Sequence, residues 1–400
     1  IYGQRYDEAG MSVGSEFQVN SYTTNAQVSS SVSALVDGGF VVTWQSYGQD
    51  GDSHGIYGQR YDVASNPVGS EFQVNSYTSS TQGTPSVASL IDGGFVVTWS
   101  SYGQDGSLYG IYGQRYDAAG NVGGGEFQIS TYTTNSQHKA SVVSLADGGF
   151  VVTWDSDGQD GDGNGIYGQR YDASANAVGG EFQVNTYTDN LQYDPSITSL
   201  VGGGFVVTWS YFDSDPVSHG VYGQQYDASG NPVGSELHAG SQNAYNPSVT
   251  SLADGGFLVT WESNENSGSF VDVYGQRYDV AGNKVEGEFH INTYTTNAQH
   301  SPSSTTLTDG SVVVAWESYL QDGDKTGIYA KRYSVASPGP LLANEGLLTQ
   351  STYYEVQSGD TWESIATQIY GTADVADELQ TAQGNPSLTT GLQLINLPTQ

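Results

Sequence analysis

Short runs of apolar residues, separated by Gly, Asp and Asn, recur along most of the chain. In one representative unit, a β-prone run at residues 85–91 is followed by Asp92-Gly93-Gly94 and then by Phe95-Val-Val-Thr-Trp99. Asp and Gly tolerate a positive φ, so this order predicts a β-hairpin. Alternate residues of the second run, Phe95, Val97 and Trp99, would face one side and the residues between them the other. Because both sets include valine, we expect both faces of this strand to be buried.

Two further strands complete the unit. A loop rich in Gly and Asp, residues 102–110, leads into a third strand at residues 111–117, and a turn of small residues leads into a fourth at residues 126–130. Each unit therefore predicts four short antiparallel strands and no helix. Units of this kind arranged around an axis form a β-propeller, in which each four-stranded unit is one blade.

The unit is repeated from the first residue to about Ser334. Its most regular part is the sequence IYGQRYD of the third strand, whose starts are 55 residues apart except for one interval of 52. A fixed period of this size is typical of propellers, solenoids and arrays. The seven copies start at Ile1, Ile56, Ile111, Ile166, Val221, Val273 and Ile328.

The number of blades stays open at this stage. The hairpin of the first two strands occurs six times, each time ending in Trp, whereas the third strand occurs seven times. Residues 1–20 therefore supply only the outer half of a blade. Either an upstream hairpin completes a seventh blade, which we favour, or these strands close a six-bladed ring. An open solenoid or stacked fibre is the closest other architecture, but solenoids with one coil per repeat have shorter periods.

Charge and composition narrow the function. Ten Lys and Arg against 43 Asp and Glu give a net charge of −33, which opposes binding to nucleic acid or to an anionic lipid surface. No run approaches the roughly 18 apolar residues of a membrane span, so membrane insertion is not expected. The chain has no Cys, so an extracellular form would depend on core size, repetition or metal. It begins within a repeat and without Met, so we expect it to be part of a longer polypeptide.

Residues 1–334 resemble the Gly- and Asp-rich repeats of large secreted bacterial surface proteins and calcium-dependent adhesins. The resemblance rests on the recurring IYGQRYD strand, the Asp-Gly-Gly hairpin and the loops of Gly and Asp. It implies a secreted or cell-surface location. It carries no assigned activity.

The repeat ends at Ser334, and residues 335–352 are predicted to be a linker to a separate module at residues 353–400. In that module a strand around Tyr354 precedes a helix that begins at Asp360 or Thr361. A second helix is predicted at residues 372–382 and a second strand at residues 392–398. The expected fold is a small βααβ domain.

The module closely resembles the LysM domain. The matching residues are Tyr354-x-Val-x-x-Gly-Asp-Thr-x-x-x-Ile-Ala, then Tyr370-Gly371, then Leu388-x-x-Gly391-x-x-Leu394; Gln383 stands where the family usually has Asn. The resemblance implies binding of glycans that contain N-acetylglucosamine, such as peptidoglycan or chitin, in a shallow groove. A packing or spacer module is the alternative. On this chain the groove would be lined by Gly359, Asp360, Thr361, Trp362, Ile365, Asn385, Pro386, Ser387 and Leu388.

The loop between the second and third strands is a candidate calcium site. Ca²⁺ takes six to eight oxygen ligands, and carboxylates at alternate positions of a flexible Gly-rich turn can converge on one ion. The alternative is a solvated acidic turn, in which Asp and Gly satisfy the backbone geometry. The predicted ligands are Asp155, Asp157, Asp160 and Asp162 in the third of the complete units, and Asp50, Asp52, Asp322 and Asp324 in related loops.

Catalytic motifs are not evident in the sequence. The six His lie at non-equivalent positions without a Ser or Cys partner motif, and carboxylates are too numerous to single out a glycosidase pair. We expect an enzyme to break the repeat with unique residues at the propeller axis, and none stands out. The loop tyrosines, such as Tyr132 and Tyr187, could stack on sugars, but their recurrence favours packing. The recurring Arg, such as Arg115, is expected to pair with a Glu of the neighbouring fourth strand.

Taken together, these features predict a non-enzymatic, adhesin-like protein that is secreted or held at the cell surface. A calcium-associated propeller would display an acidic surface, and the LysM-like module would attach it to peptidoglycan or a chitin-like glycan. The alternative is a structural subunit of an extracellular layer or filament that self-associates through propeller contacts.

Overall fold

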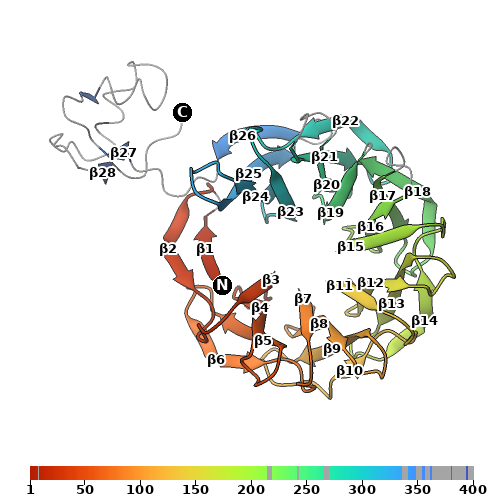
Figure 1. The fold of residues 1–400 in the computed structure, drawn as a ribbon. Helices are drawn as coiled ribbons and strands as arrows, with labels where there is room; N and C mark the ends of the chain where they lie inside the picture. Colours follow the sequence, from red (N-terminus) through yellow and green to blue (C-terminus); the bar gives the residue numbers. More distant parts are fainter. Residues whose placement is uncertain are drawn as a thin grey trace.

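A computed structural model describes residues 1–347 except 8, 214–218, 241–242, 265–269 and 336–340, and also residues 354–355, 361–362, 380 and 393–394. Strands β1 to β26 of this part form six four-stranded antiparallel sheets and one two-stranded sheet. Figure 1 shows the sheets arranged as a ring, with the first strand of each four-stranded sheet nearest the axis. The predicted mainly-β propeller of four-stranded antiparallel blades is confirmed.

The blades follow one another in chain order. Blade 1 contains β3 (Gln27–Ala34), β4 (Phe40–Tyr47), β5 (His54–Tyr61) and β6 (Pro67–Gln73). Blade 2 contains β7 (Gln82–Ser89), β8 (Phe95–Tyr102), β9 (Tyr109–Tyr116) and β10 (Phe127–Gln128). Blade 3 contains β11 (Gln137–Ser144), β12 (Phe150–Asp157), β13 (Asn164–Tyr171) and β14 (Ala177–Gln183).

Blade 4 contains β15 (Leu191–Ser199), β16 (Phe205–Phe212), β17 (Gly220–Tyr226) and β18 (Pro232–Gly240). Blade 5 contains β19 (Ala244–Ser251), β20 (Phe257–Ser263), β21 (Asp272–Tyr278) and β22 (Lys284–His290). Blade 6 contains β23 (Gln299–Thr306), β24 (Val312–Tyr319), β25 (Thr326–Val335) and β26 (Leu341–Leu347).

The structure has six complete blades, so the favoured count of seven is wrong. The two-stranded sheet of β1 (Tyr2–Tyr6) and β2 (Ser12–Gln18) lies between blade 6 and blade 1 (Figure 1) and corresponds to the outer half of a blade. No inner hairpin accompanies it among the residues described. It packs on blade 1 instead: the Phe17 and Tyr61 ring centroids are 5.4 Å apart, and the Tyr61 hydroxyl donates to the Val19 carbonyl at 3.1 Å.

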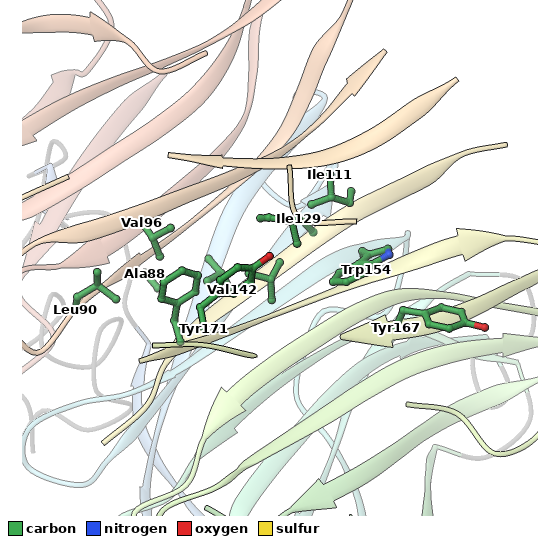
Figure 2. Close-up of a cluster of buried hydrophobic side chains, with 12 residues drawn as sticks. Ala88, Leu90, Val96, Ile111, Ile129, Val142, Trp154, Tyr167 and Tyr171 are labelled. Carbon is green, nitrogen blue, oxygen red and sulfur yellow. The ribbon is translucent and has the colours of Figure 1, made fainter. Parts of the chain in front are cut away.

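The core lies between blades, as the alternation in the second strand predicts. Phe95, Val97 and Trp99 of β8 pack against residues of blade 1, including Leu35 and Val41. The opposite face of the same strand packs on blade 3: Figure 2 shows Val96 among a cluster that includes Val142 and Trp154. The inner strands of blades 2 to 5 are therefore covered on both sides by neighbouring blades, which stabilises the ring through apolar area that no single blade could bury alone.

The recurring Arg pairs with a different acid from the one expected. Arg115 forms its ion pair with Asp92 of the first hairpin turn, and Arg170 pairs with Asp147 at 3.2 Å. The Glu of the fourth strand serves another purpose, because Glu126 accepts hydrogen bonds from the Ser76 backbone N–H at 2.6 Å and from Gln104. That contact joins the segment leaving one blade to the fourth strand of the next. The predicted pairing of Arg with this Glu is wrong.

Little of the C-terminal module falls within the described residues. Strand β27 (Tyr354–Glu355) pairs antiparallel with β28 (Gln393–Leu394), and Tyr354 lies opposite Leu394. The two predicted helices lie almost entirely outside the described residues, so the βααβ fold stays a prediction. In the part of the chain that is described, no helix has the length and apolar character needed to cross a bilayer.

Candidate functional site

Each inner strand carries a two-residue β-bulge that faces the propeller axis. In blade 2 the register of β7 against β8 shifts between Gly83 and Ser86, and Thr84 has a φ of 51°. This left-handed conformation recurs at the equivalent residue of every blade, although none of the six is Gly, which indicates that the surrounding sheet imposes it. The six residues are Ser29, Thr84, Lys139, Asp194, Asn246 and Ser301. The bulge also explains why the first strand begins earlier than the predicted residue 85.

The bulges surround a cavity of about 560 Å³ on the axis. Most of its lining is Ser, Pro, Thr and Asn, but blades 3 and 4 contribute the oppositely charged residues Lys139 and Asp194, which form an ion pair. About half of the Lys139 side chain is exposed, against 13% for Asp194. Two adjacent blades therefore break the repeat at the axis, which is the feature that the sequence analysis sought and did not find.

A buried carboxyl group lies beside this ion pair. Asp155 of β12 is directly opposite His138, the residue that precedes Lys139, and its side chain is almost fully buried. Burial raises the pKa of Asp155 to about 7; the hydrogen bond from Asn164 at 2.9 Å opposes this shift, and the charge of Asp194 reinforces it. Within the described residues, Oδ1 of Asp155 is buried without a hydrogen-bond partner. Asp155 is therefore a protonated carboxyl group over much of the range below neutral pH.

An aromatic ring completes this group of charges. Tyr193 precedes Asp194 and stacks on Phe212, with ring centroids 4.9 Å apart and an interplanar angle of 10°. Burial raises the Tyr193 pKa, and the charges of Asp194 and Asp155 raise it further, so the phenol lies within electrostatic range of both carboxyl groups. We call Lys139, Asp155, Tyr193 and Asp194 the axial cluster.

A second buried acid near the axis, Glu262 of blade 5, has a different environment. Its Oε1 accepts hydrogen bonds from the Asn246 side chain at 2.8 Å and from the Ser301 backbone N–H at 2.7 Å. Its Oε2 is 2.9 Å from Nδ1 of His300. These contacts satisfy the carboxylate and tie two neighbouring bulges together, so Glu262 is a structural residue.

The predicted calcium ligands are distributed between a strand and its following loop. Asp155 lies inside β12 and Asp157 at its end, whereas Asp160 and Asp162 lie in the loop. The loop carboxylates accept hydrogen bonds from nearby backbone, such as the Ser80 N–H to Asp52 at 2.8 Å and the Asp324 N–H to Asp322 at 3.1 Å. Nowhere in the described residues do three or more Asp, Glu or His side chains form a group that could hold a metal ion. Calcium binding stays a prediction.

Most of the predicted glycan groove lies outside the described residues. Thr361 is exposed and Trp362 is half-buried. The remaining predicted groove residues, Gly359, Asp360, Ile365, Asn385, Pro386, Ser387 and Leu388, are not among those described.

Comparison of equivalent positions in the repeat would have identified the axial cluster. The residue after the core Trp is Gln45, Ser100, Asp155, Ser210, Glu262 or Glu317, and the bulge residue is charged only in blades 3 and 4. The sequence shows these differences. It does not show that the bulge residues face the axis, because the alternation pattern gives no sign of the one extra residue that each bulge inserts.

Comparisons with known proteins inform the fold. No protein-family model and no curated protein sequence matches the chain. Among solved structures, a protein of unknown function from Dyadobacter fermentans aligns with a TM-score of 0.55 at 11% identity, over 76% of this chain and 93% of its own. An α-L-arabinanase from Penicillium chrysogenum, complexed with arabinobiose, aligns with a TM-score of 0.51 at 16% identity, over 78% and 94%. An α-L-arabinofuranosidase mutant from Fusarium graminearum, in complex with an iminosugar inhibitor, aligns with a TM-score of 0.50 at 12% identity, over 78% of this chain and 94% of its own.

These likenesses establish a propeller fold shared with carbohydrate-cleaving enzymes. The prediction of a non-enzymatic, adhesin-like protein is corrected on two findings. Two of the three neighbours are enzymes named for arabinose-containing substrates, and the axis of this chain carries unique charged residues at otherwise repetitive positions. The argument that excluded catalysis, the apparent lack of such residues, therefore fails.

Proposed function

We propose that this protein is a glycoside hydrolase whose catalytic groups are Asp155 and Asp194 of the axial cluster. The observation that carries the proposal is that two neighbouring carboxyl groups have opposite environments. Burial holds Asp155 in the protonated form up to a pKa of about 7, whereas Asp194 forms an ion pair with Lys139. A buried carboxyl group that keeps its proton, beside a carboxylate held in an ion pair, can divide the roles of acid and base with it.

In the proposed reaction Asp155 is the general acid. It donates its proton to the glycosidic oxygen as the bond from that oxygen to the anomeric carbon breaks. Asp194 accepts a proton from the water molecule that attacks the anomeric carbon, so each turnover consumes one water. Lys139 is a positioning residue that holds Asp194 through their ion pair.

The chemistry of the site favours an uncharged glycan. The net charge of −33 repels a polyanionic polysaccharide, and the one cation of the axial cluster is already paired with Asp194. Tyr193 supplies a ring beside both carboxyl groups, and the His138 ring contacts that of Tyr109, with centroids 4.3 Å apart and an interplanar angle of 47°. Aromatic rings of this kind pack against the C–H faces of sugars. Neutral arabinan- or xylan-like chains are therefore the proposed substrate class.

The test is the release of reducing ends from a panel of neutral polysaccharides that includes arabinan and xylan. We expect Asp155→Asn and Asp194→Asn each to lower kcat by about 10²- to 10⁴-fold, because general acid–base catalysis contributes on this scale. We also expect kcat/KM to fall as the pH rises above about 7, since Asp155 then loses the proton that it must donate.

Glu317→Gln provides the matched control. Glu317 occupies the same repeat position in blade 6 but is exposed, and its substitution should leave turnover unchanged. If no polysaccharide of the panel is cleaved, or if both Asp variants keep full activity, the proposed function is wrong.

The C-terminal module extends this proposal. Its LysM-like sequence would hold the enzyme on glycan that contains N-acetylglucosamine, such as peptidoglycan or chitin, and so concentrate it at a surface, consistent with the predicted extracellular location. Co-sedimentation with each insoluble glycan, compared between the full chain and a chain that ends at Ala343, tests this attachment. Pelleting that does not depend on residues 344–400 would argue against it.

A further inference from the structure

Blade 4 differs from its neighbours where its second strand, β16, ends and the loop to β17 begins. In blades 1 and 2 the sequence Ser-Tyr-Gly-Gln-Asp-Gly begins two residues after the core Trp. Blade 3 keeps the Ser, Gly and Gln of this sequence. In blade 4 the corresponding residues, starting at Tyr211, are Tyr-Phe-Asp-Ser-Asp-Pro. In blades 1 to 3 that Gln donates a hydrogen bond to the Glu of the fourth strand, as Gln159 does to Glu181. Blade 4 has no Gln at this position, and the equivalent acid is Glu236.

A cavity of about 480 Å³ lies in blade 4 where these residues change. Its volume is in the range of small-ligand pockets. Its floor is held in place, because the Asn185 side chain donates to the Tyr187 carbonyl at 2.8 Å and to Oε1 of Gln192 at 3.0 Å. The cavity is lined by Asn185, Thr186, Tyr187, Gln192, Trp209, Tyr211, Asp213, Tyr222 and Glu236.

Three tyrosine rings form the walls of this cavity. The rings of Tyr187 and Tyr211 are 5.5 Å apart at 77°, and those of Tyr211 and Tyr222 are 5.6 Å apart at 80°. Tyr211 replaces a small Ser that is fully buried in blades 1 to 3. Tyr187 is 52% exposed, so one ring offers its surface to a ligand that enters from solvent.

The polar groups of the cavity include both donors and acceptors. Asp213 and Glu236 supply carboxylates; Glu236 accepts a hydrogen bond from the Thr186 backbone N–H, and the Tyr211 hydroxyl donates to Asp213 at 3.4 Å while it accepts from Asn190 at 3.2 Å. Trp209 lines the cavity, whereas the indole Nε1 groups of the other five core tryptophans are buried without a partner in the described structure.

We infer that this cavity is a binding site for a neutral sugar ring. Tyrosine faces suit the C–H surface of a sugar, carboxylates accept hydrogen bonds from its hydroxyl groups, and hydroxyl and indole groups can donate to its oxygens. An organic cation would also suit tyrosines and carboxylates, but the donor groups favour a ligand that both donates and accepts. The site is formed by blade 4 and by the segment that leads into it from blade 3. It is argued from residues other than the proposed catalytic groups, so it does not depend on the proposed catalysis.

The test is binding of arabinobiose and cellobiose, with tetramethylammonium as the cationic comparison, by isothermal titration calorimetry. The protein carries Asp155→Asn so that turnover does not consume the probes. We expect at least one disaccharide to bind, Tyr187→Ala to weaken that binding about tenfold, and Tyr211→Ser, which restores the residue of blades 1 to 3, to weaken it as well. Because Tyr187 is half-exposed, its truncation should leave the circular dichroism spectrum unchanged.

Tyr132→Ala is the matched control. Tyr132 is the equivalent residue of blade 3 and contacts the loop there, with its hydroxyl 3.4 Å from the Gly158 carbonyl, so its loss should not affect sugar binding. The inference is overturned if neither disaccharide binds, if binding is insensitive to Tyr187→Ala, or if tetramethylammonium alone binds in a Tyr187-dependent way. These outcomes are independent of the turnover measured for the axial cluster, so either site can fail without the other.

Discussion

Asp155 shows how one residue can matter more through its surroundings than through its sequence position. The equivalent residue is polar in every blade, but in blade 3 it is a carboxyl group with a buried, unpartnered Oδ1 beside Lys139 and Asp194. A buried carboxyl group is stable mainly in its neutral form. Retaining such a group costs stability at neutral pH, and we attribute its presence to the proposed role as an acid.

The cost should be measurable as pH-dependent stability. The folded-state pKa of about 7 lies above the ordinary value of 3.8, so the folded state binds more protons between these values and its stability falls as the pH rises through this window. Asp155→Asn removes the effect. We expect the variant to match the unmodified protein near pH 4 and to gain roughly 2–4 kcal/mol in free energy of unfolding at pH 8, measured by urea denaturation. Equal stability of the two proteins at pH 8 would show that Asp155 is not buried as described.

At the scale of the element, the first hairpin of a blade depends on close contacts made by its turn. Its turn places the second Gly against the third strand: a Cβ added at Gly149 would lie 2.2 Å from the Tyr171 carbonyl oxygen. The preceding Asp accepts a hydrogen bond from this Gly, as Asp147 does at 3.0 Å, and also pairs with Arg170. The Asp-Gly-Gly sequence thus joins the turn to the strand beside it.

Gly149→Ala should therefore destabilise the propeller. The new methyl group would overlap backbone that cannot move without disturbing β13, at a cost of about 1–3 kcal/mol. Gly202→Ala, in the corresponding turn of blade 4, is the control because no atom lies within 4 Å of its added Cβ. Thermal unfolding followed by circular dichroism compares the two. If Gly202→Ala lowered the Tm as much as Gly149→Ala, the close approach of the added Cβ to the Tyr171 carbonyl oxygen would not be the cause.

At the scale of the whole molecule, the chain has a net charge of −33, and most of its acidic residues lie in the near-identical blades of the ring. Self-repulsion of this size opposes the compact state, and salt screens it. The acidic loops repeat around the ring, so if each loop bound a cation, several cations would stabilise one molecule. The described loops use their carboxylates to accept backbone hydrogen bonds, which leaves calcium binding to experiment.

We expect millimolar CaCl₂ to raise the Tm by several degrees more than MgCl₂ at the same ionic strength, because Ca²⁺ accepts the irregular oxygen geometry of a flexible loop and Mg²⁺ does not. Differential scanning calorimetry measures this, and a chelator should reverse it. If CaCl₂ and MgCl₂ raised the Tm equally, calcium would act only by screening charge, which would contradict the predicted calcium sites.

The sequence by itself determined the strands, the hairpins and the burial of both faces of strands such as β8, because pairing within a blade is local and leaves a period-two pattern that repeats every 55 residues. The tertiary structure decided how many complete blades the ring contains, since β1 and β2 pack on blade 1 without an inner hairpin. It also decided the two sites. Lys139 and Asp194 meet only because bulges turn them toward a shared axis. Tyr187, Tyr211 and Glu236 line one cavity only because the segment before β15 packs beside β16 and β18. Contacts between blades depend on long-range geometry, which a local pattern of polar and apolar residues does not record.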